Sequence, residues 1–176
     1  MESGLYIIDA IIIAIVVLPF ALFINGRHKR KRKLRKALEQ VATRSNCKLS
    51  KIDTYSNFAI GWDAAQEKLL FYKETADSAY AKVVDLKVIM SCRIVKDAKR
   101  VKDKKTHYDV IEKLQLSFEP KNKKDIVSLE LYNNDDEMVL SNELVVAQEW
   151  EAFLNKYLAD KHQIIASENQ KEMAAA

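Results

Sequence analysis

Residues 110–119 (VIEKLQLSFE) and 126–132 (IVSLELY) carry the clearest structural pattern of the chain. Apolar and polar side chains alternate in both runs, which is typical of β-strands with one buried face. The intervening residues 120–125 (PKNKKD) have the composition of a turn. We therefore predict two neighbouring antiparallel strands, and the expected inward-facing residues are Leu114, Leu116, Phe118, Val127, Leu129 and Leu131.

The pattern changes to helical spacing after residue 140. Ser141 or Asn142 is a suitable N-cap, and Glu143 follows in the first turn, where the helix dipole favours a negative charge. The spacing predicts a C-terminal helix packed on the sheet. Its expected apolar stripe is Leu144, Ala147, Trp150, Phe153, Leu154, Tyr157 and Leu158.

Short period-two runs separated by turn residues also occur in residues 47–96, and a charged stretch at residues 97–106 separates them from residues 110–119. The predicted fold class is therefore α+β, with an antiparallel bent sheet or barrel of about seven strands closed by the C-terminal helix. Residues 47–160 form this domain, and residues 161–176 are expected to form a mobile tail because no pattern continues there.

This order of elements, with a tryptophan at residue 150 in the middle of the closing helix, resembles the pleckstrin-homology-like (PH-like) fold. Bacterial membrane-anchored proteins with such domains have a similar layout. The resemblance implies a helix that plugs one end of a bent barrel. Lipid-binding members carry basic residues in the loop between their first strands, whereas residues 54–57 and 63–67 have no such cluster here. The resemblance therefore assigns recognition of a lipid headgroup to no residue of this chain.

Residues 5–24 (LYIIDAIIIAIVVLPFALFI) form a long apolar run, with fourteen Leu, Ile, Val or Phe among twenty residues. Such a run predicts a transmembrane helix. No Lys or Arg precedes it and eight follow directly, so the positive-inside rule places residues 1–4 outside and residues 27–176 in the cytoplasm. The expected localisation is the inner (plasma) membrane, single-pass. A cleaved signal peptide is the alternative, but its basic residues would precede the apolar run.

Residues 25–46 combine a strongly basic segment with an amphipathic helix. Leu34, Ala37, Leu38, Val41 and Ala42 have helical spacing, and we expect this apolar face to dock on the domain. The cations are expected to contact anionic lipid headgroups; a plain stop-transfer signal and, more weakly, nucleic-acid binding are the other interpretations. The cations are Arg27, Lys29, Arg30, Lys31, Arg32, Lys33, Arg35 and Lys36.

A second basic cluster follows within the domain. We expect it to form a charged loop that contacts lipid or a partner, or that is simply solvated, because Asp97 and Asp103 lower its charge. Residues 37–176 carry a net charge of −2, so a domain-wide nucleic-acid surface is excluded. The cluster comprises Lys96, Lys99, Arg100, Lys102, Lys104 and Lys105.

Catalytic and cofactor motifs are absent from the sequence. The three histidines are not spaced as metal ligands, Cys47 and Cys92 form no CxxC pair, and Gly61 is the only glycine after residue 26. We therefore predict no metal, no cofactor and no enzymatic activity. The expected function is a membrane-tethered binding or scaffold module that recruits a protein partner. An anionic-lipid surface sensor and an enzyme with an unrecognised site are the alternatives.

Overall fold

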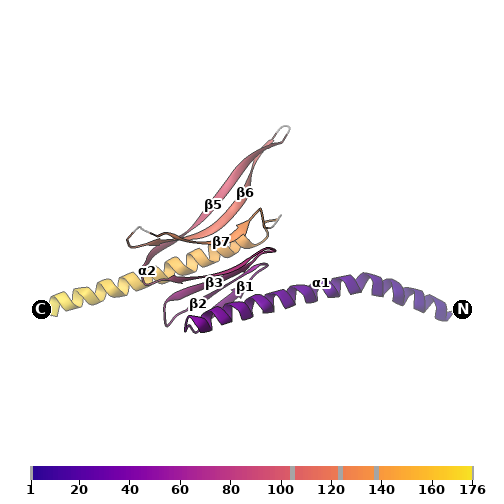
Figure 1. Cartoon of the computed structure of the whole chain (residues 1–176), viewed down its shortest axis with the longest axis horizontal. Helices are drawn as coiled ribbons and strands as arrows, with labels where there is room; N and C mark the ends of the chain where they lie inside the picture. Colours follow the sequence, from indigo (N-terminus) through magenta and orange to yellow (C-terminus); the bar gives the residue numbers. More distant parts are fainter. Residues whose placement is uncertain (1, 104–105, 123–124, 137–138, 176) are drawn as a thin grey trace.

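The computed structural model describes residues 2–103, 106–122, 125–136 and 139–175. A long helix, α1 (Glu2–Arg44), is followed by seven strands and a second long helix, α2 (Glu143–Ala175). The two helices extend in opposite directions from the sheets, so the chain termini lie at opposite ends of the molecule (Figure 1). The predicted α+β composition, with its C-terminal helix, is confirmed.

The strands form two antiparallel sheets with sequential order. The first has four strands, β1 (Lys51–Thr54), β2 (Phe58–Asp63), β3 (Lys68–Glu74) and β4 (Ala79–Asp85). The second has three strands, β5 (Ile89–Asp103), β6 (Thr106–Pro120) and β7 (Val127–Asn133). The two runs with the clearest alternation, residues 110–119 and 126–132, pair as β6 and β7.

The main core lies between the two sheets and α2. Five of the six residues predicted to point inward from β6 and β7 belong to it, and the sixth, Val127, is partly buried and packs against it. Trp150 is 1% exposed, as predicted, and its ring contacts Phe153 edge-on with centroids 5.5 Å apart. Phe153 in turn contacts Trp62 of β2 at 5.1 Å. The closing helix is therefore part of the core and not a free partner surface.

The last part of α1 packs on the opposite face of the four-stranded sheet. Leu34, Leu38 and Ala42 are buried there against Ala59 and Leu70. The predicted docking of this amphipathic segment on the domain is confirmed. Both faces of β2 and β3 are therefore covered, one by the main core and one by α1.

Gly61 of β2 allows this close approach of helix and sheet. A Cβ at this position would lie 3.0 Å from Leu38 Cδ2 and 3.2 Å from the Lys51 carbonyl oxygen. A side chain at residue 61 would therefore require the Leu38 side chain and the neighbouring strand to shift.

The prediction of a transmembrane helix is wrong. No helix in the described part of the chain is long and apolar enough to cross a membrane. Residues 5–24 do not form a separate element; they begin α1, a helix of 43 residues that continues without a break through the basic segment. The same finding contradicts two further predictions, that of a membrane-tethered, single-pass protein and that of an inner-membrane localisation.

The predicted closed barrel is also wrong, because within the described residues the two sheets share no strand pairing. Along β5, side chains of α2 take the place of a neighbouring strand. Asn155 Oδ1 accepts the Cys92 N–H at 2.9 Å, Asn155 Nδ2 donates to the Cys92 carbonyl at 2.7 Å, and Glu151 Oε1 accepts the Ile94 N–H at 2.7 Å. The backbone groups of this edge are thus satisfied without closing a barrel.

Two further segments differ from the expected layout. Residues 97–103 and 106–109 extend β5 and β6 into a long hairpin, with a register shift between Asp97 and Ala98. The hairpin projects from the rest of the molecule (Figure 1). Helix α2 continues to Ala175 through the residues expected to form a tail, whose mobility stays a prediction.

Candidate functional site

The predicted basic segment of residues 27–36 lies on α1 just before the helix meets the sheet. Arg30 and Lys31 follow Arg27 by three and four residues, so they lie on the same side of α1 as the buried Leu34 and Leu38. One face of α1 is therefore apolar where it covers the sheet and cationic where it passes beyond the sheet. Docking of the apolar part fixes the position of the cationic part.

A cavity of about 630 Å³ lies under this cationic face. Arg27, His28, Arg30 and Lys31 line it from α1. The opposite wall comes from the turn between β1 and β2 and from the start of α2. Its residues are Tyr55, Ser56, Ser141, Asn142 and Glu143.

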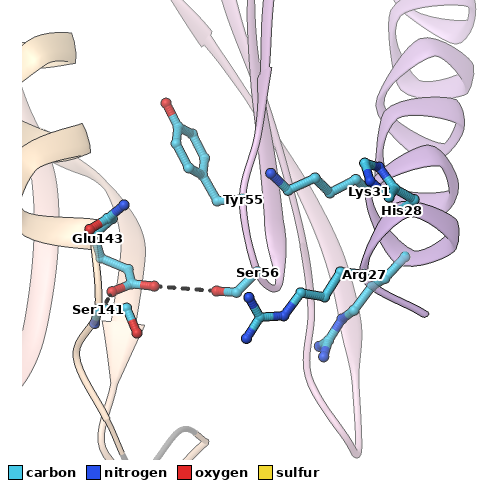
Figure 2. Close-up of a pocket in the computed structure, with 9 residues that line it drawn as sticks. Arg27, His28, Lys31, Tyr55, Ser56, Ser141 and Glu143 are labelled. Carbon is cyan, nitrogen blue, oxygen red and sulfur yellow. Dashed lines mark hydrogen bonds between the residues drawn. The ribbon is translucent and has the colours of Figure 1, made fainter. Parts of the chain in front are cut away.

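Glu143 organises the opposite wall of this groove. The Ser56 hydroxyl donates to Glu143 Oε1 at 3.2 Å, and the Ser141 backbone N–H donates to Glu143 Oε2 at 2.6 Å. Figure 2 shows the Ser56–Glu143 bond linking the β1–β2 turn to the start of α2. Glu143 is buried and sits in the first turn of α2, where the helix dipole stabilises its charge. Both of its carboxylate oxygens are therefore engaged within the wall.

Tyr55 belongs to the opposite wall of the groove. Its ring packs on Phe58 with the ring centroids 4.8 Å apart. Burial, and to a smaller extent the nearby Asp53 carboxylate, raises the pKa of its hydroxyl to about 12, so the phenol keeps its proton at neutral pH. Lys31 extends from α1 toward Tyr55 (Figure 2). Lys31 and Tyr55 thus border the same hollow from opposite sides.

A second cavity of about 560 Å³ lies next to the first. Lys29, Arg30 and Lys33 of α1 line it, so Arg30 borders both cavities. The other wall includes Asn57 of the β1–β2 turn and Glu74 at the end of β3. Lys33 Nζ donates to Glu74 Oε1 at 2.5 Å across this cavity.

The remaining cations of the first segment have other positions. Arg35 pairs with Glu39 one turn further along α1, with Nε and Oε1 3.0 Å apart. Arg32 and Lys36 are exposed and line neither of these two cavities. The eight predicted residues are therefore split by the helix into a groove-facing set and an outward set.

The second predicted basic cluster lies in a strand and not in a loop. Lys96, Lys99, Arg100 and Lys102 belong to β5, and Lys104 and Lys105 lie outside the described residues. Two of these cations face acidic groups on β6: Lys99 lies 3.7 Å from Glu112, and Arg100 lies 3.2 Å from Asp109. The four described cations of this cluster line neither cavity.

Sequence reasoning missed Tyr55, Ser56 and Asn57 because they read as an ordinary turn between two strands. Glu143 was noted only for its place in the first helical turn. Their common role depends on residues about ninety positions apart meeting in space, and no local pattern signals that. Among the described residues, no group of three or more His, Cys, Asp or Glu is placed to hold a metal ion.

Comparison with protein-family models, with curated proteins and with solved structures gave no match. The PH-like resemblance therefore stays a prediction. The function has to be argued from the groove itself.

Proposed function

We propose that this protein is a non-enzymatic binding module that holds an acidic segment of a partner protein in the groove between α1 and the β1–β2 turn. The observation that carries the proposal is the placement of Arg27, His28, Arg30 and Lys31 on one face of a docked helix, over a hollow of about 630 Å³. Charge-assisted hydrogen bonds to carboxylates are roughly twice as strong as neutral ones.

The shape of the groove favours a segment of chain as the ligand. Three elements border the hollow, and its far wall includes Tyr55, Ser56 and Ser141. A segment that enters the groove contacts the cations on one side and this polar wall on the other. A flat anionic surface would contact the exposed outward cations, such as Arg32 and Lys36, as readily as the groove.

Titration of the full chain with a fluorescein-labelled polyglutamate peptide, followed by anisotropy, tests the proposal. Replacing Arg30 and Lys31 together with Gln should weaken binding by roughly tenfold or more, because two charge-assisted contacts are lost. The matched control, Arg32→Gln with Lys36→Gln, removes the same charge outside the groove. This control should change the affinity less than about threefold, through long-range attraction alone.

Two results would contradict the proposal. Equal losses in the two double variants would mean that the whole basic segment acts as an unspecific charge. Displacement of the peptide by phosphatidylserine vesicles, with equal dependence on Arg32 and Lys36, would indicate an anionic lipid surface as the ligand.

A further inference from the structure

Strand β4 ends the four-stranded sheet, and within the described residues no strand pairs with its outer edge. Its pairing with β3 identifies the backbone groups on that edge. The Leu86 N–H donates to the Glu67 carbonyl at 2.8 Å, so the backbone groups of Leu86 point to β3. Alternate residues of an antiparallel strand direct their N–H and C=O groups to opposite sides. Those of Ala81 and Val83 therefore point to the open edge.

The other edges of the two sheets are covered or short. Along β5, Asn155 and Glu151 of α2 bond to the backbone. At β7, Lys82 Nζ donates to the Ser128 carbonyl at 2.8 Å. Strand β1 has only four residues, whereas β4 has seven and pairs with β3 without a register shift. In the described part of the chain, β4 is thus the long and regular edge, and such an edge is a template for a further strand.

An apolar hollow of about 400 Å³ lies beside the C-terminal end of β4. Val83 and Val88 in its lining are 42% and 52% exposed. Ile126, which lies between two lining residues in the sequence, is 60% exposed. Removing such side chains from water is favourable, so the hollow suits an apolar side chain of a partner. Its apolar lining residues are Val83, Val84, Val88, Ile89, Pro120 and Val127.

The chain segments that supply most of this lining are basic. Residues 82–88 and 120–125 together carry five Lys and two Asp. Lys121, Asp85 and Asp125 are the charged residues of the lining itself. One carboxylate is already used, since Asp85 Oδ1 accepts the Lys87 N–H at 2.9 Å. The charge around the hollow is therefore complementary to an acidic occupant.

We propose that the open edge of β4 and this hollow bind an extended segment of a partner protein, which adds to the sheet as a further strand. In this mode of recognition the main chain supplies hydrogen bonds and a side-chain pocket supplies specificity. The segment places an apolar side chain in the hollow and carries acidic residues at its flanks. The site shares no lining residue with the α1 groove and does not rest on the proposed function.

A second copy of the chain fits this edge less well. If two β4 strands paired antiparallel around Lys82, Ala81 of one copy would lie opposite Val83 of the other. An alanine is too small to fill a hollow of about 400 Å³. A partner segment with a larger apolar residue at this position is therefore the better occupant.

Titration of the full chain with a fluorescein-labelled peptide, followed by anisotropy, tests the proposal. The peptide alternates valine with threonine and has one glutamate at each end. N-methylation of alternate residues removes the N–H groups from one edge of the peptide, and the two possible sets give two methylated peptides. One of these should bind roughly tenfold more weakly than the parent peptide, because its lost N–H groups face β4. The other should bind within about threefold of the parent.

Variants of the chain locate the peptide. Ala81→Pro removes an outward N–H of β4 and should weaken binding roughly tenfold, whereas Ala81→Ser keeps this N–H and should change the affinity less than about twofold. The melting temperature of Ala81→Pro should stay close to that of the natural chain, because proline is tolerated on an edge strand where the N–H faces solvent. Val88→Ser should weaken binding about fivefold through the hollow. Val145→Ser on α2 removes an equally exposed valine and is the matched control.

Several results would overturn the proposal. If the parent peptide does not bind, or if both methylated peptides bind equally well, no strand is added to β4; this comparison decides even if Ala81→Pro unfolds. Replacing Arg30 and Lys31 with Gln should change the affinity less than about threefold, and a complete loss would place the peptide in the α1 groove. Sedimentation of the natural chain as a dimer that Ala81→Pro dissociates would assign the edge to a second copy.

Discussion

The molecule carries two basic segments, residues 27–36 of α1 and residues 96–103 of β5, and they have opposite surroundings. The first adjoins a helix stretch that is docked on the sheet through Leu34, Leu38 and Ala42, and it faces a hollow. The second lies on strands that project from the molecule (Figure 1). Two of its cations already lie within 4 Å of acidic groups of β6.

The difference shows that the number of cations in a segment says little about its capacity to bind. On the hairpin, Lys99 and Arg100 meet carboxylates across the strand pair, and exposed pairs of this kind are nearly neutral in energy. On α1, the cations that share the docked face meet a wall whose single carboxylate, Glu143, is occupied by two donors. The fixed position of the cations on a docked helix, and not their number, distinguishes the α1 groove from the hairpin.

The largest expected effect comes from loosening the docked helix. Leu38→Ala removes a fully buried side chain from the α1–sheet contact and should lower the free energy of unfolding by about 2–5 kcal/mol. Urea titration at equilibrium measures it. Val145→Ala on α2 removes an exposed side chain and should cost less than about 0.5 kcal/mol. Equal costs for the two variants would show that α1 is not held on the sheet.

The next effect concerns Asp63, which anchors the chain where it leaves α1. Its carboxylate accepts the backbone N–H groups of Lys48, Ala65 and Gln66 at 2.7, 2.9 and 3.0 Å. Burial alone would raise the pKa of Asp63, but these donors outweigh it and the pKa is lowered. Asp63→Ala should cost about 2–3 kcal/mol at neutral pH. The exposed Asp77→Ala should cost little.

The lowered pKa also sets the sign of a pH dependence. The stability that Asp63 contributes is present above its unfolded-state pKa of about 3.9, and it is lost as the pH falls through the lower folded-state value. The difference in urea midpoint between the natural chain and Asp63→Ala should therefore shrink on acidification. A difference that grows at low pH would show that the carboxylate is not held ionised by the three N–H groups.

The smallest effect is expected on the hairpin. Arg100→Ala breaks the exposed pair with Asp109 and should change the free energy of unfolding by only about 0–1 kcal/mol, decreasing further in high salt. The same substitution should leave the affinity for the polyglutamate peptide unchanged within about twofold. A loss above about 2 kcal/mol, or a tenfold loss of peptide binding, would remove the contrast between the two segments.

Much of the core could be predicted from periodicity, because alternation at Leu114–Phe118 and helical spacing around Trp150 reflect local backbone geometry. The docked row at Leu34 and Leu38 was predictable for the same reason. The prediction for residues 5–24 relied on their apolar composition alone. It did not take into account that these residues continue without a break into the rest of α1. The hairpin was missed because its outer strands alternate charged residues with few apolar ones, so no buried face marks them.

The groove could not be predicted, since it depends on long-range contacts. Ser56 contacts Glu143 only because the start of α2 lies beside the β1–β2 turn. Residue types at these positions are ordinary for a turn. The basic residues could be identified in the sequence. The sequence alone did not identify which of them share a helix face with the docked Leu34 and Leu38.

Lysine acetylation footprinting of the natural full-length chain, with and without the polyglutamate peptide, tests the central claim most directly. Mass spectrometry reports the modification of each lysine in one experiment. The account predicts that the peptide protects Lys31, which lines the groove, while Lys96 and Lys99 on the hairpin and Lys36 on the outward side of α1 react as before. Protection of Lys96 and Lys99 with unchanged Lys31 would contradict it.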